Sequence, residues 1–274
     1  MTLYQIAQIL TDAGIDDGRF EAGLLIEHFA KTSRAAMLAD PHRDYDVPGL
    51  AEAVQKRAER YPLQYILGTW DFMGLCFTVN ENCLIPRPDT ECIAEAAIHA
   101  LPAGGRVLDL CTGSGCIIAA VLHHTENTAG YAVELYPDTA DLARKNLDAL
   151  CLTERCTVIT GDASADLFPE EEKFDVIVSN PPYIAKDEME TLEPELDYEP
   201  RAALTDEGDG LSLIESIIRI YRNHLTKNGV MILEHGYKQS DAVCALAEKY
   251  GMKPEIIRDL GSNIRGCRCR QNRE

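Results

Sequence analysis

The segment Ser-Asn-Pro-Pro-Tyr, which ends at Tyr183, carries the residue types best suited to chemistry in this sequence. It closes a short apolar run that is typical of a buried strand. The side-chain amide oxygen of Asn180 and the backbone carbonyl of Pro181 are neighbouring acceptors, and Pro182 makes the chain beside them rigid. Such a group suits a planar NH2, from either a carboxamide or a nucleic-acid base. These four residues are the candidate catalytic residues, and the alternative is a rigid turn without a chemical role.

A glycine-containing segment, residues 109–115, forms a second candidate site after another apolar run. Glycines allow the backbone to approach a ligand closely, and a strand followed by such a loop and a helix is common in nucleotide-binding folds. The segment lacks Gly-Lys-Ser/Thr, which excludes a P-loop. Because functional loops gather at the carboxyl ends of parallel strands, both segments are expected to share one cleft. The candidate cofactor-binding residues here are Asp109, Cys111, Thr112, Gly113, Ser114 and Gly115.

Two acidic residues end later strand-like runs and extend this candidate cofactor site. Glu134 lies 25 positions after Asp109, where a carboxylate can accept hydrogen bonds from both hydroxyls of a ribose. Asp162, followed by Ala163, comes after the third run, where it could meet an adenine amine. The alternatives are a solvated strand end for Glu134 and a helix cap for Asp162.

A helix expected to run to about residue 99 should lie over the cleft, with Asp89 as its N-cap. Arg87 and Thr90, at its start, are expected near the cofactor or the substrate. The alternatives are a surface ion pair for Arg87 and a helix cap for Thr90. In the long acidic loop after Tyr183, Glu199 and the proline after it are expected to close the cleft, although a structural turn is equally compatible.

The order of the predicted elements indicates an α/β fold. Strand-like runs at residues 106–110, 130–133, 157–160, 174–179 and 230–234 alternate with helical patterns, which predicts a parallel sheet with helices on both faces. Residues 72–79 read as a further strand, and the arginine-rich tail alternates as a strand does. We predict a helical domain over residues 1–70, a β-hairpin or linker over 71–84 and a catalytic domain over 85–274.

Composition excludes several classes of protein. The 274 residues contain no apolar run of the roughly 20 residues that span a bilayer, and the first residues lack a signal peptide, so we expect a cytoplasmic protein with no membrane partner. The ten cysteines show neither a disulfide framework nor zinc-ligand spacing, so no metal is expected. A formal net charge of −19 opposes binding to nucleic-acid backbones and fits a small-molecule or basic protein partner, or solubility alone.

Together these residues resemble a class I S-adenosylmethionine methyltransferase, a Rossmann-like fold with a seven-stranded sheet. More closely, they resemble the HemK/PrmC family of protein-glutamine methyltransferases. The resemblance covers residues 60–265, and its matching segments are residues 64–68, 85–91, 109–115, 180–184, 199–204 and 208–211. Residues 1–70 share with the family only a helical character, which is what the resemblance implies for its small substrate-recognition domain.

The resemblance implies transfer of a methyl group from S-adenosylmethionine to the side-chain amide nitrogen of the glutamine in the Gly-Gly-Gln motif of class I peptide chain release factors, with S-adenosylhomocysteine as product. Asn180 and the Pro181 carbonyl would hold the amide, and Tyr183 would pack against it. The alternatives are a glutamine of a large-subunit ribosomal protein and, less in keeping with the acidic composition, adenine N6 of DNA.

Two positions depart from the family pattern. Cys111 stands where many members have glycine, which is compatible with cofactor binding if the position keeps an ordinary φ. Ala163 stands where many have tryptophan, so a stacking surface near adenine is expected to be missing.

Overall fold

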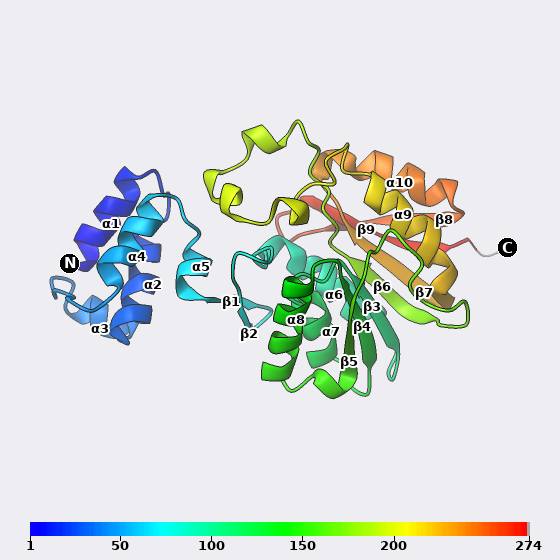
Figure 1. Ribbon diagram of the computed structural model, residues 1–274, viewed down its shortest axis with the longest axis horizontal. Helices are drawn as coiled ribbons and strands as arrows, with labels where there is room; N and C mark the ends of the chain where they lie inside the picture. Colours follow the sequence, from blue (N-terminus) through cyan, green and yellow to red (C-terminus); the bar gives the residue numbers. More distant parts are fainter. Residues whose placement is uncertain (273–274) are drawn as a thin grey trace. The chain divides into compact units, whose positions relative to one another are not determined.

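The computed structural model describes residues 1–272. The chain packs as two compact units (Figure 1). The helical unit consists of Met1–Thr69 together with Glu193–Tyr198, and the catalytic unit consists of Trp70–Leu192 and the chain from Glu199 onward. No helix within residues 1–272 is long and apolar enough to cross a membrane.

The helical unit buries one apolar core. Thr2 begins the first helix with a capping box, in which its hydroxyl accepts from the Gln5 N–H and the Gln5 side chain accepts from the Thr2 N–H. Ile6 and Leu10, one turn apart, are fully buried in this core beside Leu25 of the second helix. The helices are α1 (Leu3–Asp12), α2 (Gly18–Ala30), α3 (Arg34–Ala39), α4 (Leu50–Ala58) and α5 (Leu63–Leu67).

A buried ion-pair cluster joins the short segment Glu193–Tyr198 to the helices of this unit. Arg57 of α4 bonds Glu21 at 2.5 Å and Glu195 at 2.9 Å, and Arg60 reaches Glu195 at 2.7 Å. The side chain of Arg57 is only 6% exposed. A guanidinium buried this deeply needs such partners, so this part of the long acidic loop is held in place by paired charges.

The catalytic unit is built on a seven-stranded sheet with the order β5-β4-β3-β6-β7-β9-β8. Five strands are parallel, and β9 runs antiparallel to both of its neighbours. The predicted α/β fold with a seven-stranded sheet is therefore confirmed, but the strand–helix alternation predicted an all-parallel sheet, and β9 departs from it. The strands are β3 (Arg106–Leu110), β4 (Ala129–Glu134), β5 (Cys156–Thr160), β6 (Phe174–Ser179), β7 (Leu225–Glu234), β8 (Met252–Arg258) and β9 (Ile264–Gln271).

Helices cover both faces of this sheet (Figure 1). One apolar cluster packs the Val107 and Val176 face against α6 (Glu91–Ala100), α7 (Cys116–His123) and α8 (Pro137–Ala149). The other packs the Leu108 and Ile177 face against α9 (Ser212–Tyr221) and α10 (Ser240–Lys249). Because alternate side chains of the central strands enter different clusters, these strands are apolar on both faces.

The β-hairpin or linker expected over residues 71–84 corresponds to a hairpin of β1 (Thr69–Phe72) and β2 (Leu75–Thr78), because Met73 and Gly74 adopt positive φ and turn the chain. The single strand predicted at residues 72–79 and the N-cap predicted at Asp89 were wrong. Asp89 does not cap α6. It lies in a 3-10 turn, Pro88–Thr90, and its carboxylate pairs with Arg265 at 2.7 Å.

Candidate functional site

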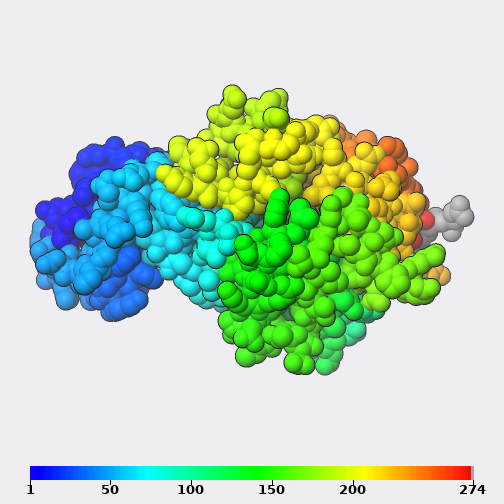
Figure 2. Space-filling view, viewed as in Figure 1, coloured from blue at the N-terminus to red at the C-terminus, as the bar shows by residue number. Residues whose placement is uncertain are grey.

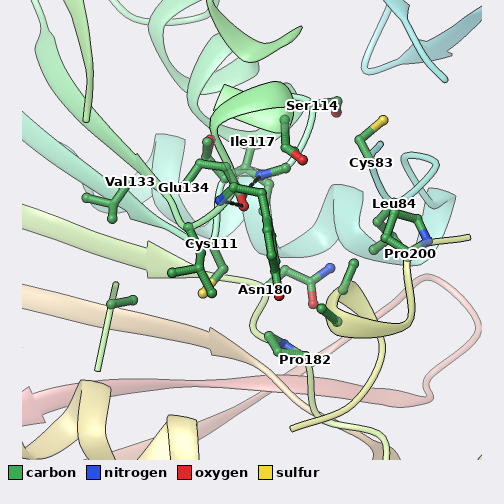
Figure 3. Close-up of a pocket in the computed structure, with 18 of the residues that line it drawn as sticks. Cys83, Leu84, Cys111, Ser114, Ile117, Val133, Glu134, Asn180, Pro182 and Pro200 are labelled. Carbon is green, nitrogen blue, oxygen red and sulfur yellow. Dashed lines mark hydrogen bonds between the residues drawn. The ribbon is translucent and has the colours of Figure 1, made fainter. Parts of the chain in front are cut away.

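A cavity lies at the carboxyl ends of β3, β4 and β6, where both candidate loops were expected to meet. Figure 3 shows Cys111, Glu134 and Asn180, which come from the ends of these three strands, around this one cavity. Predicted site residues that line the cavity are Arg87, Thr90, Cys111, Thr112, Gly113, Ser114, Glu134, Asp162, Ala163, Asn180 and Pro182. Asp109, Gly115, Pro181 and Tyr183 are not among its lining residues.

The glycine loop brings its backbone to the cavity at Gly113. Gly113 has a φ of +57°, and a Cβ added there would meet nothing within 4 Å, so the loop is open on that side. Gly115 has a φ of +81°, and its Cβ would touch Ala143 of α8 at 3.4 Å. The first glycine leaves room for a ligand, and the second allows close packing between the loop and a helix.

Cys111 was expected to be compatible with cofactor binding if it kept an ordinary φ, and it does not keep one. Its φ is +60°, in the left-handed region that glycine adopts most easily. The chain must turn sharply there between β3 and α7, and a residue with a Cβ is strained by about 1–2 kcal/mol in this conformation. The structure thus explains why glycine suits this position.

Asp109 supports the loop from behind. It is fully buried, and its Oδ2 accepts a hydrogen bond from the Thr112 hydroxyl at 2.6 Å. Burial raises the pKa of Asp109 to about 7, although hydrogen bonds from Thr112 and the Ile118 N–H lower it. The carboxyl therefore holds the shape of the loop and does not face the cavity.

Glu134 is oriented by backbone N–H groups. Its Oε2 accepts from the Gly113 N–H at 3.0 Å and its Oε1 from the Tyr136 N–H at 3.2 Å. Burial raises the pKa of the carboxyl, and these N–H groups lower it. Each oxygen has a further lone pair, so the side chain can still accept hydrogen bonds from a ligand in the cavity.

At the predicted adenine end, Asp162 and Ala163 both line the cavity. Asp162 Oδ1 accepts from the Ser164 N–H at 2.8 Å, which is the local turn expected of an aspartate after a strand. Ala163 is 6% exposed and adds no aromatic ring.

Asn180 is held by a neighbouring hydroxyl. Its Nδ2 donates to Thr90 Oγ1 at 3.4 Å, which leaves Oδ1 as the acceptor for a ligand. The hydroxyl of Ser179 donates to the Leu110 carbonyl at 2.7 Å and ties the loop to β3. The phenol of Tyr183 donates to Glu234 Oε1 at 3.2 Å, and packing of its ring against a substrate stays a prediction.

The expected closing residue, Glu199, is buried against the wall of the cavity. Its Oε2 accepts from the Ile85 N–H at 2.9 Å, and its Oε1 pairs with Arg87. The following residue, Pro200, lines the cavity (Figure 3). Arg87 is also one of the lining residues. Much of the long loop that contains Glu199, residues 184–208, lies at the surface and is yellow-green to yellow in Figure 2.

Sequence reasoning missed two buried polar residues that organise the site. Asn146 of α8 donates to the Ser114 carbonyl at 2.9 Å and the Thr78 carbonyl at 3.0 Å, which fixes the glycine loop to β2. Its signal was a polar residue on the apolar face of a helix. Glu234, at the end of β7, receives the Tyr183 phenol. It reads as an ordinary strand end, so the sequence offered no signal for it.

Comparison with known proteins assigns the chain to a family. The family described as "PrmC N-terminal domain" matches residues 2–68, and the family "Methyltransferase small domain" matches residues 91–228. A release factor glutamine methyltransferase of Bordetella pertussis is 37% identical over 92% of this chain and 93% of its own length. Another, from Salmonella typhimurium, is 34% identical over 96% of this chain and 95% of its own length. The chain belongs to the release factor glutamine methyltransferase family.

Membership in this family confirms the predicted resemblance and makes the chain a methyltransferase. A solved structure, a ribosomal protein L11 methylase from Lactobacillus delbrueckii subsp. bulgaricus, shares the fold with a TM-score of 0.52. The match covers 71% of this chain and 84% of the methylase chain at 18% identity, so the likeness concerns the fold alone.

Proposed function

We propose that this chain transfers a methyl group from S-adenosylmethionine to the side-chain amide nitrogen of the glutamine in the Gly-Gly-Gln motif of class I release factors. The names of its relatives support the substrate class. The observation that carries the chemistry is Asn180, whose Nδ2 is held by Thr90 and whose Oδ1 remains an acceptor at the cavity.

The cavity suits S-adenosylmethionine in several respects. The face of Gly113 is open, so the cofactor can lie against the backbone of the loop. The hydroxyl of Ser114 is buried and has no hydrogen-bond partner of standard geometry within residues 1–272, so it can bond a ligand. We infer that Glu134, whose carboxylate is oriented by backbone N–H groups, would accept hydrogen bonds from the ribose hydroxyls, and that Asp162, which lines the same cavity, would accept from the adenine amine.

The chain's own groups address the poor nucleophilicity of an amide nitrogen, whose lone pair is delocalised into the carbonyl. Asn180 Oδ1 and the Pro181 carbonyl would each accept one N–H bond from the substrate amide and turn the face of its NH2 plane toward the methyl group. Both acceptors also stabilise the positive charge that develops on nitrogen. S-adenosylmethionine, when bound, would supply an electrophilic methyl carbon, and S-adenosylhomocysteine would be the leaving group as the amide nitrogen takes the methyl group. The methylated nitrogen then loses its proton to water.

The experiment is transfer of labelled methyl from S-adenosylmethionine to a purified release factor. Label on the wild-type factor, and none on a factor with alanine in place of the motif glutamine, is the expected result. Asn180→Ala should lower kcat about 100-fold, as loss of one transition-state hydrogen bond does. Asn223→Ala, at an exposed residue outside the cavity, is the matched control. Label that persists on the alanine-substituted factor, or moves to a ribosomal protein, overturns the proposed substrate.

We infer that the helical unit recognises the release factor away from the modified glutamine. It exposes Phe20 at 51% and Leu38 at 66% around one groove, with Arg34 stacked 4.6 Å above the Phe20 ring. A single glutamine buries too little surface to give specificity, and exposed apolar side chains of this kind mark protein contacts. Phe20→Ser should raise KM for the release factor with kcat unchanged, and an unchanged KM would refute this role.

A further inference from the structure

Glu234 is a buried carboxyl beside the acceptor loop that the proposed chemistry does not use. It lies at the carboxyl end of β7 and is 4% exposed. Its Oε1 accepts from the Tyr183 phenol at 3.2 Å, and its Oε2 has no partner of standard geometry within residues 1–272. Burial of a carboxyl costs free energy unless hydrogen bonds compensate for the lost contact with water.

The surroundings of Glu234 contain further polar groups. The hydroxyls of Thr90 and Tyr183 hydrogen-bond to the carboxyl and lower its pKa, whereas burial raises that pKa to about 7. The nearest charges are Asp89 and Arg265, which pair with each other at 2.7 Å. Arg265 is also bound to Asp259, so it is not a dedicated partner of Glu234.

Thr90 connects this carboxyl to the acceptor amide. Thr90 is 2% exposed, and its Oγ1 accepts from Nδ2 of Asn180 at 3.4 Å. A hydroxyl that accepts from an amide still has its own proton to donate, and the Glu234 carboxyl is the acceptor beside it. Asn180 therefore donates to Thr90, and Thr90 donates to Glu234. The Tyr183 phenol donates to the same carboxyl.

We propose that Glu234 is a positioning residue, which fixes the direction of the Thr90 hydrogen bond and thereby the orientation of the Asn180 amide. An amide can sit in two orientations that differ by a half-turn, and only one presents Oδ1 to the substrate NH2. In its ionised form the Glu234 carboxyl only accepts hydrogen bonds, so the Thr90 proton then points toward Glu234 and the Thr90 lone pair toward Asn180 Nδ2. The Tyr183 phenol, held by the same group, anchors the other end of the acceptor loop. This inference rests on the proposed function.

Glu234→Gln separates this role from simple packing. Glutamine has the same shape and can still accept from Tyr183, but its NH2 group would donate toward Thr90 and reverse the direction of that bond. We expect kcat for methyl transfer to fall about 10- to 100-fold, as for a reacting group displaced from its productive geometry. KM for the release factor, the Kd for S-adenosylhomocysteine and the Tm should change little. Glu248→Gln, at an exposed carboxylate of α10, is the matched control.

Variants of Thr90 provide the second measurement, and they carry the test if Glu234→Gln does not fold. Thr90→Ser keeps the hydroxyl and should retain more activity than Thr90→Val, which removes it. In the double variant Glu234→Gln with Thr90→Val, the losses in kcat should not multiply, because both break one chain of bonds. Glu234→Gln with wild-type kcat, or equal kcat for the two Thr90 variants, overturns the inference alone. A wild-type enzyme that does not label the release factor overturns the proposed function.

Discussion

Gly210→Ala tests whether the long loop after β6 holds the acceptor segment in position. Gly210 has a φ of +75°, and a Cβ built there would lie 1.9 Å from the backbone oxygen of Tyr183. That oxygen already accepts from Gln239 Nε2 at 2.8 Å, and the Gly210 N–H donates to Asp206 Oδ1 at 2.9 Å. Hydrogen bonds therefore hold both sides of the overlap, and the alanine methyl cannot be accommodated by a side-chain rotation.

The size of the effect follows from this geometry. Cβ contacts under 3.0 Å are essentially never seen, so the two backbones must separate by at least 1.1 Å, the difference between 3.0 and 1.9. A misplacement of about 1 Å at the reacting groups costs about 100-fold in rate, and Tyr183 is three residues from Asn180. The left-handed backbone adds about 1–2 kcal/mol for a residue with a Cβ. With the overlap, we expect the free energy of unfolding to fall by about 2–4 kcal/mol.

Gly251→Ala is the matched control. Gly251 also has a φ of +75°, but its added Cβ would meet nothing within 4 Å. It should show the backbone penalty of about 1–2 kcal/mol with wild-type kcat. The assays are methyl transfer to a release factor under saturating conditions and urea unfolding of both variants. If Gly210→Ala keeps wild-type kcat and loses no more stability than Gly251→Ala, the loop moves aside freely and the reasoning is refuted.

Three further changes test other parts of the structure. Glu134→Gln removes the charge that would bond the ribose and should weaken binding of S-adenosylhomocysteine about 10- to 100-fold by calorimetry; a change below about threefold would contradict ribose binding. Arg57→Met leaves Glu21 and Glu195 without their shared cation and should lower the free energy of unfolding by about 3 kcal/mol, whereas a loss under about 1 kcal/mol would show that the cluster is solvated. Asp109 has a folded pKa raised to about 7, so its contribution to stability is present at pH values below its unfolded pKa and is lost as the pH rises toward 7. Between pH 5 and 7 the free energy of unfolding of the wild-type protein should fall, and in Asp109→Asn this fall should be smaller by at most about 3 kcal/mol. If the variant shows the same pH dependence as the wild type, a group other than Asp109 titrates in this range.

Local sequence patterns were sufficient for the elements that carry the site. The runs at residues 106–110 and 174–179 are strands with those bounds, because apolar residues buried on both faces and followed by turn formers leave few other structures. The same patterns place the glycine loop and the Asn-Pro-Pro-Tyr segment at strand ends. Parallel strands bring those ends to one edge, so a shared cavity could be predicted before any coordinates.

Only the tertiary structure decided which side chains complete the site. Asn146, Glu199 and Glu234 reach the loops from distant parts of the chain, and no spacing in the sequence joins them to their partners. Tyr183 turns toward Glu234 because a buried carboxyl and a phenol satisfy each other there. The amino-acid sequence by itself indicated the family, and its short-range periodicity determined the five parallel strands and the loops at their carboxyl ends. The buried hydrogen bonds that orient those loops depend on which elements pack together, and so only the folded chain decides them.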